Sequence, residues 1–196
     1  MTEATTLTKK ERAARARAAI LAAARRQFAR HGFDHTTIRA VAAEADIDPS
    51  MVIRYYGSKH ELFLAATDLD LAVPDLAAVP PAERGEVTIR HFLDLWEGPE
   101  ADDLLQMLLA SAANSPAAAD RVRDVIEGGL QQAVMNAVDD DPAVARARAA
   151  LVTSQILGLA LCRYILRIPA AIELSRETII AGLGPVLSGL LSQELP

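Results

Sequence analysis

Residues 48–63, DPSMVIRYYGSKHELF, gather side chains that are suited to contacts with a nucleic acid. The stretch holds three of the eight aromatic residues of the chain, Tyr55, Tyr56 and Phe63, together with Arg54 and Lys59. Guanidinium and ammonium groups bind phosphates, and arginine, hydroxyl and apolar side chains also contact base edges and thymine methyl groups. The stretch therefore indicates a nucleic-acid surface, provided that the surrounding elements present these side chains on one face.

Capping residues divide the region around this stretch into short helices. We expect four of them, over residues 9–30, 37–45, 49–56 and 58 to about 71. Gly32 ends the first helix, because glycine favours the left-handed conformation that closes a helix. Thr36, Asp48 and Ser58 occupy N-cap positions of the other three, and Glu61 completes a capping-box pattern with Ser58.

The second and third predicted helices form a helix-turn-helix, since only the turn Asp46-Ile47-Asp48 separates them. In this motif the second helix of the pair lies in the major groove of DNA. A helical period turns Val52 and Tyr56 toward the other helices. The residues expected on or near the outer face are Ser50, Met51, Arg54 and Tyr55. The pattern by itself also fits a small helical bundle with ordinary surface residues.

The charge of the chain is divided unevenly along the sequence. Residues 1–67 hold 11 Lys/Arg and 7 Asp/Glu, a net charge of +4, whereas residues 68–196 hold 9 and 19, a net charge of −10. The whole chain has a net charge of −6. This asymmetry indicates a basic functional domain attached to an acidic domain, although chance variation in the charges of solvent-exposed surfaces gives the same pattern.

Other function classes find little support in the sequence. The four histidines lack metal-ligand spacing, there is no Gly-rich phosphate loop or G-x-S-x-G pattern, and no cofactor or enzymatic activity is expected. The single cysteine, Cys162, excludes an internal disulfide and suits a reducing cytoplasm. The N-terminal residues contain scattered charges and no apolar core of a signal peptide. The apolar run over residues 150–166 contains polar residues and is interpreted as a buried helix, not as a membrane span.

The residues from Ile20 to Ala66, ILAAARRQFARHGFDHTTIRAVAAEADIDPSMVIRYYGSKHELFLAA, resemble the DNA-binding domain of the TetR (tetracycline-repressor) family of bacterial regulators. The resemblance rests on A-x-x-x-F-x-x-x-G-F, T-T-I-R and Y-G-S-K-x-x-L-F. It implies an all-α homodimeric transcription factor, usually a repressor, that binds a double-stranded DNA operator and is released by a small molecule. We expect a helix-turn-helix domain over residues 1–67 and a ligand-binding and dimerisation domain over residues 68–196.

The family resemblance also implies which side chains contact DNA. Its second helix uses the first turn, here Thr37 and Arg39, and its phosphate-binding lysine matches Lys59. The recognition helix offers Ser50, Met51, Arg54 and Tyr55. The aromatic residue at the position of Tyr56 normally packs inside.

Two positions depart from the family pattern. Asp46 replaces the usual glycine of the turn, which should survive because aspartate tolerates the left-handed conformation better than most residues. Ile53 replaces a phosphate-contacting tyrosine, and we expect it to pack in the core. Ahead of the resemblance, five basic residues between Lys9 and Arg17 either follow DNA phosphates or a minor groove, or form a solvated helix end.

The remaining chain predicts a second helical domain. Amphipathic segments are expected over residues 86–96, 101–114, 117–138, 142–168 and 176–192, with Gly182, Gly184 and Pro185 kinking or dividing the last. By resemblance, the segments 142–168 and 176–192 pair with their copies in a four-helix dimer interface.

A ligand pocket among the middle helices is implied by the same resemblance. Its candidate lining residues are Phe92, Trp96, Met107, Gln155, Cys162 and Arg163. If Gln155 and Arg163 face inward, each needs a partner, which is either a ligand or an acidic residue of a neighbouring helix. The alternative to a transcription factor is a helical small-molecule-binding or protein-interaction module that no longer binds DNA.

Overall fold

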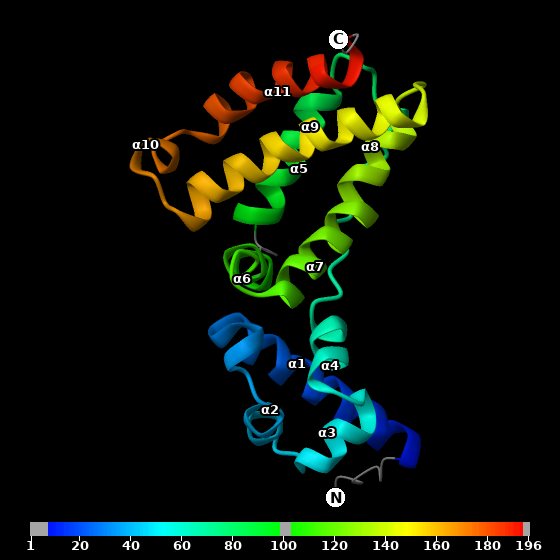
Figure 1. Cartoon of the computed structure of the whole chain (residues 1–196), viewed down its shortest axis with the longest axis vertical. Coiled ribbons are helices and arrows are strands. Elements are labelled where there is room, and N and C mark those ends of the chain that lie inside the picture. Colours follow the sequence, from blue (N-terminus) through cyan, green and yellow to red (C-terminus); the bar gives the residue numbers. More distant parts are fainter. Residues whose placement is uncertain (1–7, 99–102, 194–196) are drawn as a thin grey trace, which may run out of the picture. The chain divides into compact units, whose positions relative to one another are not determined.

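The computed structural model describes residues 8–98 and 103–193, and every regular element within these ranges is a helix (Figure 1). The predicted all-α class is therefore confirmed. The chain divides into two compact units, one of residues 1–68 with 111–121, the other of residues 69–110 with 122–196. The short segment 111–121 thus belongs with the N-terminal helices, although it lies far along the chain from them.

Four helices form most of the first unit: α1 (Lys9–His35), α2 (Ile38–Ala45), α3 (Pro49–Tyr56) and α4 (Lys59–Ala66). Gly32 interrupts α1 with φ 69° and ψ 178°, so the expected stop is present as a kink. The fourth helix ends earlier than expected, at Ala66. Thr67 follows it, and the Thr67 hydroxyl donates to the carbonyl oxygen of Phe63 at 2.7 Å.

The caps of α2 and α4 differ in detail from the prediction. The N-cap of α2 is Thr37, whose hydroxyl accepts from the amide of Ala40 at 3.1 Å. Thr36 is buried instead, and its hydroxyl donates to the carbonyl oxygen of Gly32 at 2.8 Å. Ser58 caps α4 as expected, but its own amide donates to Tyr56, so the reciprocal bond to Glu61 is not formed.

An aromatic cluster holds α1 against α4. The Phe28 and Phe63 ring centroids lie 5.0 Å apart, and those of Phe33 and Phe63 lie 4.9 Å apart, both in edge-to-face arrangements. Such pairs add roughly 0.5–1.5 kcal/mol each to the free energy gained from burial. The same core contains Val41 of α2 and Val52 of α3, both fully buried. The helix-turn-helix is therefore fixed to α1 and α4 by its apolar side.

The turn of the helix-turn-helix depends on a left-handed residue. Asp46 has φ 53° and ψ 48°, and its amide donates to the carbonyl oxygens of Ala42 and Ala43. Non-glycine residues rarely adopt this conformation, and aspartate is one of those that tolerate it. The expectation that the turn survives without its usual glycine is confirmed.

The remaining helices form the second unit, apart from residues 111 and 116–121, which belong to the first unit. Their bounds are α5 (Arg84–Glu97), α6 (Asp103–Ser111), α7 (Pro116–Ile126), α8 (Gln132–Ala137), α9 (Pro142–Ala160), α10 (Pro169–Ile172) and α11 (Arg176–Ser192), with a 3₁₀ turn η1 (Leu76–Ala78). Two π-helical turns, η2 (Glu127–Gln131) and η3 (Leu161–Ile165), follow α7 and α9 without a break. Residues 101 and 102 of the expected segment 101–114 lie outside the described residues.

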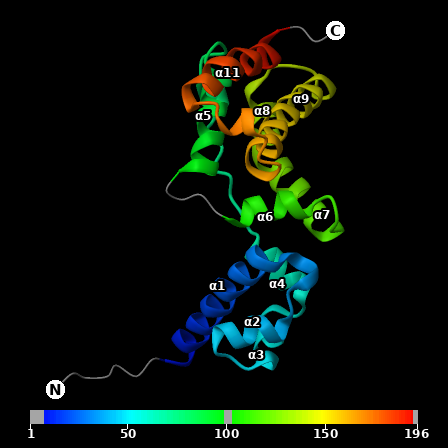
Figure 2. The same ribbon diagram turned by 90° about the vertical axis from the view of Figure 1, so that its left-hand side faces the viewer.

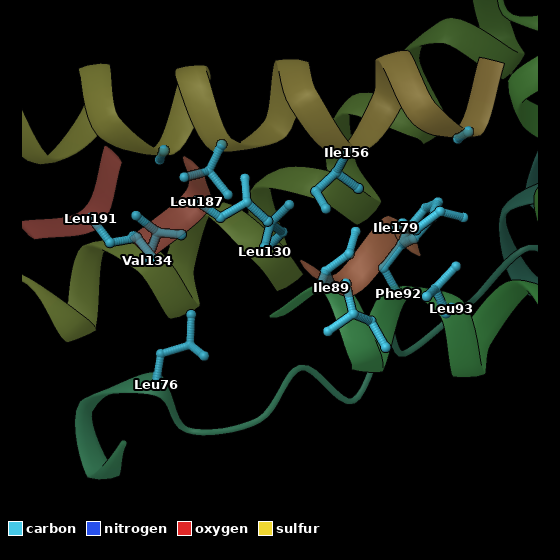
Figure 3. Packing of buried hydrophobic residues seen from close by; sticks show 14 of the residues in the cluster. Leu76, Ile89, Phe92, Leu93, Leu130, Val134, Ile156, Ile179, Leu187 and Leu191 are labelled. Carbon is cyan, nitrogen blue, oxygen red and sulfur yellow. The ribbon is translucent and has the colours of Figure 1, made fainter. Parts of the chain in front are cut away.

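The core of this unit lies between α5, α8, α9 and α11. Ile89, Phe92 and Leu93 of α5 point toward Ile179 of α11 and Ile156 of α9 (Figure 3). Ile156, Leu187 and Leu191 lie in the two segments that were expected to form the dimer interface, but their side chains are buried within the subunit core.

The α5 and α11 backbones approach each other closely. A Cβ atom added to Gly85 would lie 2.1 Å from the carbonyl oxygen of Gly184 and 2.3 Å from the amide nitrogen of Ser188. The Ser188 hydroxyl accepts from the Gly85 amide at 3.0 Å and donates to the carbonyl oxygen of Ala82 at 2.9 Å. Of the two outcomes expected at Gly182, Gly184 and Pro185, division does not occur, because α11 continues through Pro185 as one helix.

One helical segment, Pro142–Ile165, is long and apolar enough to span a membrane by length and composition alone. Its inward face packs in the core through Ala149, Val152, Ile156 and Ala160. A core helix passes the same length and composition test, so this segment is weak evidence for a membrane span.

Candidate nucleic-acid interface and ligand cavity

The outer face of α3 is formed by Ser50, Ile53 and Arg54, all of which are exposed. Ile53 has 45% of its surface accessible, so the expectation that it packs in the core is wrong. The residue follows Ser50 by three positions, which places both on one side of a helix. An exposed isoleucine between a hydroxyl and a guanidinium gives this face an apolar contact as well as hydrogen-bond donors.

Asp48 and Pro49 fix the start of α3. The Asp48 carboxylate accepts from the amide of Ser50 at 2.8 Å, and Pro49 takes the first helical position, where a missing amide hydrogen costs nothing. Hydrogen bonds from the Ser50 side chain and backbone lower the pKa of Asp48. A charged cap therefore holds the first turn, which carries Ser50 and the half-buried Met51.

Tyr55 lies between two guanidinium groups. The Arg17 guanidinium of α1 lies 5.2 Å from the Tyr55 ring centroid, and that of Arg54 lies 5.5 Å from it. Cations within about 6 Å of an aromatic face are attracted to it. Next to this ring, the hydroxyl of the half-buried Tyr56 donates to the carbonyl oxygen of Arg17 at 3.0 Å, and burial raises the Tyr56 pKa. The two tyrosines thus join the C-terminal end of α3 to α1.

The first turn of α2 presents Thr37 and Arg39, both exposed. The Thr37 oxygen accepts from a backbone amide as the N-cap, which leaves its hydroxyl hydrogen available for another acceptor. Within the described residues, Arg39 forms no ion pair. A free guanidinium beside a helix N-terminus is a favourable arrangement for a phosphate.

Lys59 is more constrained than the sequence implied. Its ammonium donates to the carbonyl oxygen of Asp34 at 3.1 Å and lies 4.5 Å from the Phe33 ring centroid. These contacts hold it near the segment that leads into α2. An ammonium has three donors, so this arrangement leaves further donors for a phosphate.

A cavity of about 80 Å³ lies inside the second unit. Apolar side chains from α5, α6, α7, η2 and α9 form nearly all of its wall, among them Phe92, Leu108, Leu130 and Ile156. Three polar residues also line the cavity: Thr88, His91 and Thr153.

Thr153 differs from the other two polar lining residues. The Thr88 hydroxyl donates to the carbonyl oxygen of Arg84 at 2.8 Å, and Nε2 of His91 donates to that of Leu71 at 2.7 Å. The hydroxyl of Thr153 is buried and has no hydrogen-bond partner among the described residues. An unsatisfied buried hydroxyl costs roughly 1–3 kcal/mol, which a suitable ligand group would offset.

The structure places the six predicted lining residues in different environments. Phe92 and Trp96 line the cavity. Met107 is buried outside it, Cys162 is half-buried in η3, and Gln155 is exposed on α9. The family resemblance places a pocket among the middle helices but does not say which face of each helix meets the cavity.

Arg163, the last of the six, is held by other parts of the second unit. Its Nε lies 2.8 Å from the Glu97 carboxylate, and its Nη1 donates to the carbonyl oxygens of Ala171, Ile172 and Leu174. The acidic partner considered for Arg163 is therefore Glu97. The Tyr164 hydroxyl donates to the same carboxylate, and the Tyr164 ring stacks on Trp96 with centroids 4.7 Å apart.

The sequence prediction did not include Ile53 or Thr153 among the site residues, for different reasons. A count of three residues from Ser50 was enough to put Ile53 on the outer face. No such signal existed for Thr153, because an apolar helix with one threonine does not say whether the hydroxyl has a partner.

The described residues hold no group of three or more His, Cys, Asp or Glu that could bind a metal ion.

Two sequence profiles match the chain. The first, described as "Bacterial regulatory proteins, tetR family", covers residues 20–66, and the second, "Tetracyclin repressor-like, C-terminal domain", covers residues 82–191. The HTH-type transcriptional repressor SCO4008 of Streptomyces coelicolor is 38% identical over 98 residues, which are 43% of this chain and 50% of that protein. The matched part thus spans half the length of this curated relative.

Solved structures agree with this assignment. The TetR-family regulator SCO0857 of Streptomyces coelicolor is 28% identical, with a TM-score of 0.69, and the match covers 92% of this chain and 96% of that one. SCO7518, a regulator from the same species, has 23% identity and a TM-score of 0.66 over 91% and 99% of the two chains, which supports the fold. With a family profile matched over more than half of its length, the chain belongs to the TetR family of bacterial regulatory proteins.

Proposed function

We propose that the protein is a cytoplasmic repressor that binds an inverted-repeat DNA operator as a homodimer and is released by an uncharged, largely apolar small molecule. The observation that carries the DNA-binding part is the outer face of α3, where Ser50, Ile53 and Arg54 are exposed together on a short helix with a firmly capped start. Helices of this kind enter the major groove by their exposed side.

The side chains divide into base-reading and phosphate-binding groups. Arg54 is suited to the O6 and N7 acceptors of guanine, and Ile53 to the methyl group of thymine, with Ser50 able to bond either kind of base edge. Thr37, Arg39 and Lys59 are suited to phosphates, since each offers a donor at the start of a helix. Met51 and Tyr55 flank the outer face of α3. Met51 contributes an apolar contact, and Tyr55 contributes a phenol hydroxyl.

Dimerisation through α9 and α11 is supported by their outer faces. Val144 and Leu151 of α9, Leu161 of η3 and Val186 of α11 are 36–47% exposed, which is unusual for so many large apolar residues on two neighbouring helices. A single recognition helix reads only a half-site, and a twofold dimer reads two. Leu151→Glu with Val186→Glu should therefore give a monomer in sedimentation experiments and abolish tight operator binding.

The effector is expected to carry no charge. The cavity wall is largely apolar. Arg163, the one charged residue among the six predicted lining residues, is paired with Glu97. Burial of an unpaired ion in such a site would be costly. One hydrogen-bonding group on the effector would satisfy Thr153. Trp96, the single tryptophan, lines the cavity and gives a fluorescence signal of binding.

The proposal is tested by selecting duplexes from a random pool with the full chain, followed by gel shifts at several salt concentrations. Enrichment of an inverted repeat is expected. Lys59→Ala should weaken binding to all sequences alike, whereas Arg54→Ala should relax the preference at one base pair at a cost of about 1–3 kcal/mol. If no duplex is enriched and none is shifted, the chain is instead a small-molecule-binding or interaction module without DNA binding.

A further inference from the structure

The first three turns of α1, residues 9–19, lie outside the core of the first unit. The first fully buried residue of α1 is Ile20, and no residue before it in the helix is buried. Thr8 and Glu11 nevertheless form a complete capping box, with the Glu11 amide 3.2 Å from the Thr8 oxygen and the Thr8 amide 2.7 Å from the Glu11 carboxylate. The segment is thus a capped helix and not a loose tail, although none of its apolar side chains is fully buried.

This segment is strongly basic. Five of its residues are positively charged, Lys9, Lys10, Arg12, Arg15 and Arg17, and Glu11 is its one acidic residue. None of the five forms an ion pair with any described residue, while Glu11 is occupied by the capping box. Full burial therefore does not explain the helix, and its positive charges have no acidic partner within residues 8–98 and 103–193.

Arg17 and Lys10 lie on the side of α1 that faces the rest of the unit. Arg17 precedes the buried residues Ala24 and Phe28 by seven and eleven positions, which are close to two and three full turns of a helix. Lys10 precedes Arg17 by another seven positions and shares its side. The core-facing side of α1 thus continues past the end of the core as exposed cations, with Arg17 and Lys10 in line with Ala24 and Phe28, and Lys9 eleven positions before the buried Ile20. Arg12 and Arg15 point the other way, about 140° and 160° around the helix from Arg17.

Contacts at the end of α3 place this side of α1 next to the recognition helix. The Arg17 guanidinium lies against Tyr55, which also contacts Arg54, and the Tyr56 hydroxyl bonds to the Arg17 carbonyl oxygen. Both views of the molecule show the first turns of α1 and helix α3 at the same end of the first unit (Figures 1 and 2).

We propose that the first turns of α1 are a second DNA contact, in which Arg17 and Lys10 bind phosphates that flank the groove occupied by α3. The inference rests on the proposed operator binding and extends its footprint. A rise of 1.5 Å per residue puts Lys10 about 10 Å beyond Arg17 along the helix, roughly the axial length of three base pairs. Lysine and arginine on a rigid helix offer charge without a fixed donor pattern, which suits phosphates better than base edges.

The test compares two double variants of the full chain that remove the same charge from opposite sides of α1. The probe is a duplex selected by the wild-type chain. It is extended by one helical turn of DNA beyond the outer edge of each half-site. Lys10→Ala with Arg17→Ala should lower affinity on the order of tenfold at physiological salt and reduce the slope of log affinity against log salt by about two. Arg12→Ala with Arg15→Ala should leave the slope near that of the wild type.

Two further measurements make the result specific. Trimming the duplex to the edges of the half-sites should weaken the wild-type chain and leave the Lys10/Arg17 variant unchanged. Lys10→Ala alone should lower the slope by about one, and it leaves the Arg17–Tyr55 contact in place, because Lys10 is exposed and forms no hydrogen bond or ion pair with a described residue. Alanine is favourable in a helix, so none of these changes threatens α1.

Equal losses of operator affinity in the two double variants would overturn the inference. They would show that affinity depends on the net charge of α1 and not on a contact made by one face of the helix. An unchanged slope for Lys10→Ala with Arg17→Ala would also overturn it, while operator binding by the wild-type chain would leave the proposed function intact. A wild-type chain that selects no duplex at all would overturn the proposed function and this inference together.

Discussion

The guanidinium of Arg121 donates to the backbone oxygen of Thr67 at 2.8 Å and to the Thr67 hydroxyl at 3.2 Å, which joins α7 to the end of α4. The same side chain lies 3.3 Å from the Asp68 carboxylate and is 14% exposed. Within the first unit, this largely buried arginine is therefore the group that fixes the start of α7 to the helix that follows the recognition helix. Further along α7, Val122, Val125 and Ile126 line the cavity.

We expect Arg121→Ala to uncouple effector binding from DNA release. The variant loses charge-assisted hydrogen bonds, which contribute roughly 1.5–3 kcal/mol each where they are buried, and α7 can then move without moving α4. Operator affinity without effector should change little, while the effector should release much less DNA. Gel shifts with and without effector measure this, and Arg146→Ala, an exposed arginine of α9, is the matched control. Undiminished release by Arg121→Ala would contradict the prediction.

Substitutions at Asp46 should change stability in opposite directions. Asp46→Gly should raise the free energy of unfolding by up to about 1 kcal/mol, because glycine adopts the left-handed conformation without steric cost. Asp46→Val should lower it by about 1–2 kcal/mol, since a β-branched residue is strained there. Urea unfolding at one fixed protein concentration compares the two. A destabilised glycine variant would show that the aspartate side chain contributes something besides its conformation.

The two turn residues of the helix-turn-helix show how far the sequence could predict the fold. The left-handed state of Asp46 and the capping by Asp48 follow from local chemistry, and both are seen. The early end of α4 did not follow, because it depends on Thr67 and on Arg121, fifty-four positions further along the chain. The end of α2 and the start of α3 are thus set by local chemistry, whereas the end of α4 involves a contact from a distant part of the chain.

Side-chain environments in the second unit were harder to predict than its helices. Gly182, Gly184 and Pro185 suggested a kinked or divided helix, but Gly184 serves a backbone approach between α5 and α11 that only the folded chain reveals. Gln155 and Thr153 stand two positions apart on α9, and one is exposed while the other lines the cavity. Helical periodicity gives the side of a helix, but the neighbours that meet each side depend on tertiary packing.

The contact between α5 and α11 should tolerate no added methyl group. Gly85→Ala places its Cβ against the backbone atoms of Gly184 and Ser188, which cannot rotate away, and removes the room for the Gly85 amide to reach Ser188. We expect a loss of roughly 1–3 kcal/mol or more in the free energy of unfolding. Gly128→Ala is the matched control, because an added Cβ there meets nothing within 4 Å. Equal midpoints in thermal unfolding would refute the close approach.

Thr153→Val should have opposite effects on the empty protein and on effector binding. Valine has nearly the shape of threonine and removes the buried hydroxyl that has no partner, so the free energy of unfolding should rise by about 1 kcal/mol or more. An effector that bonds to that hydroxyl should lose affinity, on the order of tenfold. Thermal unfolding gives the first quantity, and titration followed by Trp96 fluorescence gives the second, with a compound found by a thermal-shift screen.

Thr88→Val is the control for the same cavity wall, because the Thr88 hydroxyl already donates to the carbonyl oxygen of Arg84 at 2.8 Å. This variant loses an existing hydrogen bond and should gain no stability, and its effector affinity should stay near that of the wild type. If Thr153→Val instead binds the effector as tightly as the wild type, the hydroxyl takes no part in recognition and the effector is held by apolar contact alone. If both variants lose stability equally, the Thr153 hydroxyl has a partner in solution and the proposed anchoring group must be sought elsewhere in the cavity.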